Sequence, residues 1–112
     1  EMWREVEQTY LPHRQYAGTP FYASGRVWQR QRHIYGMPFY YIDYCLAGTC
    51  AMQMWRAAQL DRDDALKRYR ALCKLGGSMS FPDLLDAVGL KNPFTDGCLA
   101  EVCSAVEDAI GL

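Results

Sequence analysis

The stretch that decides the fold class is PFYYIDYCLAGTCAMQMWRAAQL, residues 38–60. It is apolar on nearly every side at helical spacing, and it therefore predicts one long helix from about residue 38 to residue 59. Pro38 suits the first turn of this helix, because the missing N–H of proline costs little there. A helix with so little polar surface is expected to lie at the centre of the molecule.

Three shorter helices are expected after it. Residues 61–74, DRDDALKRYRALCK, carry acids at the start and bases at the end, as the helix dipole favours, and Gly76 and Gly77 stop this helix. Its expected inward face consists of Ala65, Leu66, Tyr69, Leu72 and Cys73. Residues 80–83, SFPD, have the form of a capping box before a short helix that Gly89 ends. A last helix is expected from about Asp96 to Gly111.

The stretch before residue 38 is less regular. Residues 1–10 have apolar side chains at helical spacing and predict the end of an amphipathic helix. Residues 11–25, with two prolines and two glycines, predict a long loop. Residues 25–35 predict a short helix that Gly36 and Pro38 terminate. No stretch alternates at period two, so the predicted class is all-α, with residues 1–112 as a single helical segment.

Composition excludes several classes of partner. The net charge of −1 gives no electrostatic case for nucleic acid or an anionic membrane. The apolar runs are far below the roughly 18 residues that span a bilayer, and no secretory signal opens the chain. The five cysteines are odd in number and contain no CxxC pair. We therefore expect a reduced, cytoplasmic protein rather than a disulfide scaffold.

Common catalytic motifs are absent. The two histidines, His13 and His33, are twenty residues apart, with no HExxH pair and no cysteine–histidine cluster, so no metal site is predicted within the sequence. No GxSxG motif supports a serine nucleophile. The Gly76-Gly77 pair lacks the surrounding glycine spacing of a nucleotide-binding loop.

The remaining candidate is HIYGMPFYYIDY, residues 33–44. On a helix that starts near Pro38, Tyr40 and Tyr44 would share a face, with Tyr41 to one side, and the Gly36–Pro38 bend could bring His33 over the tyrosines. The rings could line a ligand groove or could be ordinary interior packing, and the residues alone leave both interpretations open. The same holds for four arginines, which could bind a carboxylate or form a solvated face: Arg14, Arg26, Arg30 and Arg32.

Three motifs carry a family resemblance: His33 with PFYYIDY (38–44), RALCKLGGSMSF (70–81) and VGLKNPF (88–94). Over nearly all 112 residues, the sequence resembles the C-terminal end of the oligoendopeptidase F family. These enzymes are zinc metallopeptidases related to thimet oligopeptidase. The resemblance implies a mostly helical enzyme in two halves around a deep channel that admits only short peptides.

The resemblance also implies a division of roles. One zinc ion would be held by the two histidines of an HExxH motif and a downstream glutamate, all preceding Glu1, with the HExxH glutamate as general base. His33 matches the family histidine that donates a hydrogen bond to the oxyanion, and Tyr44 matches the key tyrosine. Tyr40 and Tyr41 would be substrate-binding neighbours, with Tyr35 as a further donor.

The resulting hypothesis is an oligoendopeptidase that hydrolyses internal bonds of short peptides. The expected partners are short peptides and the N-terminal remainder of the peptidase. Without that remainder, the 112 residues should be inactive and could self-associate through uncovered apolar surface. The alternative is a non-catalytic helical module that binds peptides or complements a separate half.

Overall fold

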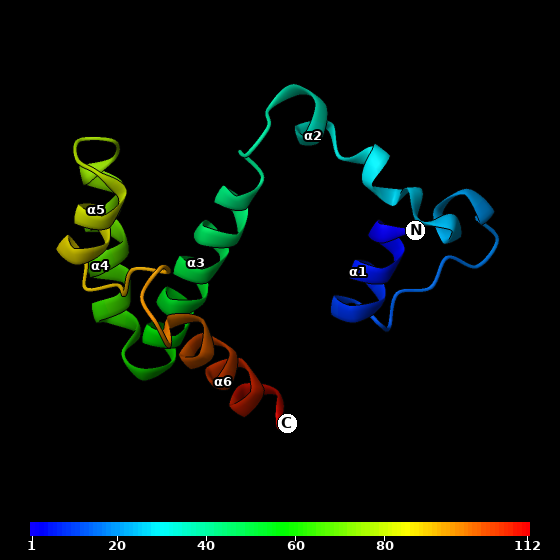
Figure 1. The fold of residues 1–112 in the computed structure, drawn as a ribbon. Helices are drawn as coiled ribbons and strands as arrows, with labels where there is room; N and C mark the ends of the chain where they lie inside the picture. Colours follow the sequence, from blue (N-terminus) through cyan, green and yellow to red (C-terminus); the bar gives the residue numbers. More distant parts are fainter. The chain divides into compact units, whose positions relative to one another are not determined.

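The computed structural model describes all of residues 1–112 (Figure 1). Its regular structure is entirely helical, which confirms the all-α prediction. None of the helices has the length and apolar character needed to cross a bilayer.

The chain divides into two compact units, Glu1–Ile42 and Asp43–Leu112. The first unit contains α1 (Met2–Tyr10), the π-helical turn η1 (Tyr22–Arg26), the 3₁₀ turn η2 (Val27–Arg30) and α2 (Arg32–Gly36). The second contains most of α3 (Ile42–Leu60), then α4 (Arg62–Leu75), α5 (Phe81–Ala87) and α6 (Cys98–Ile110).

In the first unit, η1 packs against α1 through a glycine. Gly25 has a φ of 80°, and a Cβ at this position would lie 3.0 Å from the Cβ of Arg4. Only glycine therefore combines this backbone conformation with so close an approach. Residues 11–25, predicted as a loop, thus end in a helical turn.

The short helix predicted over residues 25–35 is interrupted. It consists of η2 and α2, which are separated by Gln31 in an extended conformation with φ −81° and ψ 93°. The predicted end at Gly36 is confirmed, since α2 stops there. A side chain at Gly36 would meet nothing within 4 Å, so no neighbouring part of the chain requires a glycine at this position.

The long helix α3 begins at Ile42, and the prediction of a start near Pro38 was wrong. Phe39 has a φ of 69°, in the left-handed region that a right-handed helix cannot include. The N–H of Tyr40 donates to the carbonyl of Met37 at 3.2 Å, which closes a turn instead of starting a helix. Tyr40 and Tyr41 consequently precede α3.

The core of the second unit is small and lies beside α3, not on it. Leu85, Val88 and Leu90 form the buried cluster, and the half-buried Cys50 and Met54 of α3 pack against it. No residue of α3 is itself buried. The predicted central helix therefore flanks the core of this unit and leaves much of its apolar surface uncovered.

Side chains cap the first turns of α4 and α5, and the cap of α5 was predicted. The Asp61 carboxylate accepts the N–H groups of Asp63 at 3.1 Å and Asp64 at 3.0 Å. Ser80 accepts the N–H of Asp83 at 3.4 Å, as a capping box requires. The expected inward face of α4 is only partly covered: Ala65 is buried and Leu72 half-buried, whereas Leu66, Tyr69 and Cys73 are exposed.

Two side chains tie the loops of the second unit to its helices. Gln53 of α3 accepts the N–H of Lys91 at 2.8 Å and donates to the carbonyl of the same residue at 3.0 Å. Arg68 of α4 donates to the carbonyls of Val88 at 2.7 Å and Gly89 at 2.6 Å. These bonds satisfy backbone groups that follow α5 and hold that segment in place.

Candidate functional site

His33 is the centre of an aromatic cluster in the first unit. It is half-buried in α2 and stacks on two tyrosines from the turn before α3. Its ring centroid lies 4.9 Å from that of Tyr41, at 24° between planes, and 5.9 Å from that of Tyr40, at 27°. The structure thus brings together three of the five residues that the sequence pointed to, although by ring stacking and not along a helix face.

The two tyrosines keep much of their surface in solvent. Tyr40 is 39% exposed and Tyr41 48% exposed. Tyrosines that are fully packed in an interior have exposed fractions close to zero. The interpretation as ordinary core packing therefore does not describe Tyr40 and Tyr41 within this chain. The cluster is an accessible set of polar-tipped rings with an imidazole between helix and turn.

Tyr35 lies apart from this cluster. It stacks on Trp28 with centroids 6.1 Å apart and planes at 27°. Two residues along a helix turn the side chain by roughly 200°, so Tyr35 and His33 point to opposite sides of α2. Sequence reasoning gave Trp28 no role beyond packing. No continuous helical face links Trp28 to Tyr35, because Gln31 between them is extended.

Tyr44 occupies the first turn of α3 and is 55% exposed. It belongs to the second unit, which begins at Asp43. The predicted pairing of Tyr40 with Tyr44 on one helix face was wrong, because Tyr40 is not part of the helix. Beside this turn, Asp43, Leu46, Ala47 and Phe81 line a hollow of about 460 Å³.

A buried carboxylate forms a second polar cluster, which sequence reasoning missed. Glu7 Oε1 accepts hydrogen bonds from the Tyr16 hydroxyl and from Arg14 Nη1, the latter at 3.2 Å. The bond from Tyr16, aided by Arg14, holds the pKa of Glu7 below its ordinary value of 4.5, although burial acts in the opposite direction. These contacts join α1 to the loop that follows it.

Three of the four arginines considered as carboxylate binders make contacts of two kinds. Arg14 does bind a carboxylate, but it is Glu7 of the same chain. Arg26 lies over the ring of Phe21 at 5.4 Å, and Arg30 over that of Tyr22 at 5.3 Å. These two guanidinium groups make cation–π contacts, which stabilise the irregular segment around η1.

No group of three or more histidine, cysteine, aspartate and glutamate side chains lies close enough together to hold a metal ion. The five cysteines are free thiols. Burial, with the neighbouring Cys98, raises the pKa of Cys50. The residues of this chain therefore do not fit a zinc site by themselves.

Comparison with solved structures gives high similarity to two peptidases. A chain described as an oligoendopeptidase F superposes with a TM-score of 0.87 and 49% identity. PZ peptidase A, solved with an inhibitor, superposes with a TM-score of 0.88 and 40% identity. Each match covers 97% of this chain and 19% of the other. No protein-family model matches the chain, and neither does any curated protein.

The chain thus spans about a fifth of the length of the peptidases that it matches. Identities of 40% and 49% over nearly all of its residues, together with the shared helical fold, are consistent with the motifs around His33, residues 70–81 and residues 88–94. On these grounds, the chain belongs to the oligoendopeptidase F family.

Proposed function

We propose that this chain is the C-terminal part of a cytoplasmic, zinc-dependent oligoendopeptidase that hydrolyses internal bonds of short peptides. Support comes from its similarity to an oligoendopeptidase F and to PZ peptidase A, the latter solved with an inhibitor. The observation that carries the site assignment is the stacking of His33 on Tyr40 and Tyr41, with both tyrosines accessible.

His33 and Tyr44 serve as hydrogen-bond donors to the scissile carbonyl oxygen, where negative charge develops during peptide hydrolysis. A phenol with an ordinary pKa near 10 stays protonated at pH 7, and an imidazole N–H donates from either ring nitrogen. The stack on Tyr40 and Tyr41 restricts rotation of the imidazole ring and so orients its N–H groups. Donors fixed in advance stabilise the transition state more than the bound substrate.

Tyr40 and Tyr41 bind the substrate peptide in this proposal. Their rings offer apolar faces to side chains and hydroxyls to the peptide backbone. Tyr35, on the other side of α2, has a weaker case, because its ring is already stacked on Trp28. We retain it as a contact for the outer part of a bound peptide.

The zinc ligands and the general base lie outside this chain in the proposal. The described residues include no group able to hold the ion, so a complete active site needs the four-fifths of the peptidase that has no counterpart here. The chain then contributes donors and substrate contacts to a site assembled with that remainder.

The test is mutagenesis in the full-length peptidase, assayed with an internally quenched peptide. Tyr44→Phe and His33→Ala should each lower kcat about 10²–10³-fold, the usual effect of losing one oxyanion donor, with KM and zinc content near wild type. Tyr10→Phe, at an exposed position in α1, is the matched control and should leave kcat unchanged. Wild-type turnover in Tyr44→Phe would contradict the role of Tyr44. Loss of thermal stability without loss of kcat would assign His33 a purely structural role.

A further inference from the structure

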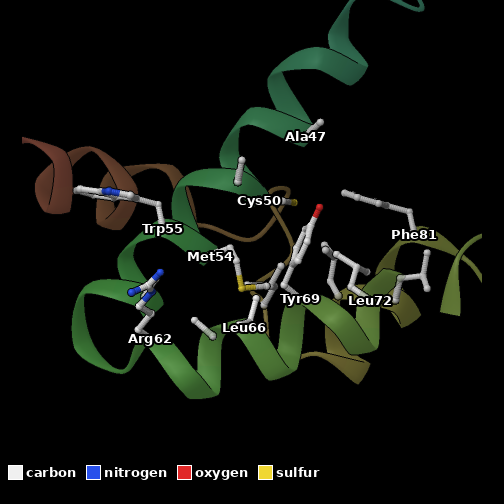
Figure 2. Close-up of a pocket in the computed structure, with 15 residues that line it drawn as sticks. Ala47, Cys50, Met54, Trp55, Arg62, Leu66, Tyr69, Leu72 and Phe81 are labelled. Carbon is white, nitrogen blue, oxygen red and sulfur yellow. The ribbon is translucent and has the colours of Figure 1, made fainter. Parts of the chain in front are cut away.

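An apolar groove lies between α3 and α4, with α5 at one end (Figure 2). Its volume is about 640 Å³. Figure 2 shows Met54 of α3 pointing toward Leu66 of α4 across the floor of the groove, with Phe81 at one end and Trp55 at the other. All of these residues belong to the second unit.

Three small residues lie on the α3 side of the groove and leave room for a close neighbour. Ala47, Ala51 and Ala58 line it at spacings of four and seven residues, so that they recur along one face of the helix. From Ala47 to Ala58, α3 rises roughly 16 Å, which is about three helical turns. Ala47 and Phe81 also line the adjoining hollow near Asp43, so the recess continues toward the first turn of α3. Alanines allow the backbone of a neighbouring helix to approach closely.

The opposite wall exposes large side chains. Leu66 is 42% exposed, Tyr69 52% and Phe81 37%. Contiguous apolar surface of this kind marks an interaction site in soluble proteins. The size also suits a helix: a cavity of about 150 Å³ accommodates one benzene ring, so this volume has space for about four apolar side chains. Four such side chains form one stripe along a three-turn helix.

The comparisons indicate which polypeptide supplies that helix. Both related peptidases extend well beyond the part that matches this chain, which is 19% of their length. We propose that the groove receives an amphipathic helix from the remaining part of the oligoendopeptidase polypeptide, with three apolar turns against Ala47–Ala58 and an acidic residue beside Arg62. This inference rests on the proposed function, in which this chain is one part of a longer peptidase.

Arg62 marks the end of the groove at which the incoming helix carries its acidic residue. It is the one ionised side chain that lines the groove, and it lies at the same end as Trp55 (Figure 2). A carboxylate at this end of the apolar stripe would pair with the guanidinium group at the edge of the contact, where arginine binds carboxylates in a planar fork.

Thiol labelling of the full-length peptidase tests the proposal. Ala51→Cys places a reporter in the groove, and Ala71→Cys places the matched reporter on the face of α4 that carries Lys67, Arg70 and Lys74. Modification by N-ethylmaleimide is followed for each cysteine by mass spectrometry, in buffer and in denaturant. Ala51→Cys should react roughly 100-fold more slowly in buffer than in denaturant, as a site that is covered except during local opening does. Ala71→Cys should differ by less than about tenfold.

Three other outcomes overturn the proposal. Equal labelling of Ala51→Cys in buffer and in denaturant means that the groove is open. Protection that disappears on dilution means that a second copy of the protein fills it. A reading frame that begins at Glu1 leaves no remainder to supply a helix.

Peptidase activity is measured on the same samples, so an inactive but protected protein would refute the proposed function alone. An active protein with a freely labelled groove would refute only this inference.

Discussion

The hydroxyl of Tyr16 donates a hydrogen bond to the carboxylate of Glu7, nine residues earlier in the chain. The same Glu7 oxygen accepts a hydrogen bond from Arg14 Nη1. Two side chains of one loop therefore converge on a single buried acceptor of α1. This arrangement holds the loop after α1 against the helix.

Acid sensitivity follows from this contact. The pKa of Glu7 lies below its ordinary value of 4.5, so the stabilisation is fully present above pH 4.5 and is lost as pH falls through the lowered pKa. Tyr16→Phe removes the largest cause of the shift, and acid unfolding should therefore begin at a higher pH. Circular dichroism during an acid titration measures the midpoint. Tyr10→Phe serves as the control, and an unchanged midpoint in Tyr16→Phe would refute the coupling.

The second unit depends on one small core. Leu85 is 2% exposed and forms the buried cluster together with Val88 and Leu90. Leu85→Ala should lower the free energy of unfolding by about 2–5 kcal/mol, the usual cost of a cavity of this kind. Leu60→Ala, at a position 82% exposed, should change it by less than about 0.5 kcal/mol. Urea denaturation compares the two variants, and equal effects would show that the cluster does not form the core.

The planar fork of Arg68 is expected to be irreplaceable by lysine. Its Nε and Nη2 reach the carbonyls of Val88 and Gly89 at the same time, which a single ammonium group cannot reproduce. Arg68→Lys should cost about 0.5–1.5 kcal/mol, the net value of the one hydrogen bond to a carbonyl that is lost. Arg70→Lys, two residues along on α4, is the control and should be neutral. A neutral Arg68→Lys in urea denaturation would contradict this prediction.

The 112 residues alone should show no peptidase activity and should self-associate. Leu66, Tyr69 and Phe81 expose apolar surface that the rest of the peptidase covers in our proposal. Light scattering should detect oligomers, and Ala51→Glu should reduce their size more than Ala71→Glu does, since only the former places a charge in the groove. A monodisperse monomer would count against an uncovered apolar surface.

Local signals in the sequence predicted the helices of the second unit well. Ser80 caps α5 and Gly76 ends α4, as expected, because each of these interactions spans only a few residues. The start of α3 was misplaced by four residues. Pro38 favours a helix start, but Phe39 adopts a positive φ, which is uncommon for a bulky residue and has no sequence signal.

Contacts between distant residues were beyond prediction from pattern. Nothing in the spacing of Glu7 and Tyr16 marks them as partners, since the end of α1 and a loop segment with Pro12 separate them in sequence. The His33 stack was anticipated only as a histidine brought over tyrosines by a Gly–Pro bend. Its actual form depends on where α3 begins, because a helix from Pro38 would have rotated Tyr40 and Tyr41 to fixed positions along its surface.

Because α3 starts late, the positions of Tyr40 and Tyr41 against His33 depend on the length of the segment that precedes the helix. Residues 38–41 form a short tether outside the regular hydrogen bonding of α3, whose first residue is Ile42. Adding or deleting one residue in this tether would shift Tyr40 and Tyr41 against His33, while every i to i−4 bond from Ile42 onward keeps its partner. The rings of Tyr40 and Tyr41 can therefore be repositioned by a change in chain length alone, independently of the helical scaffold.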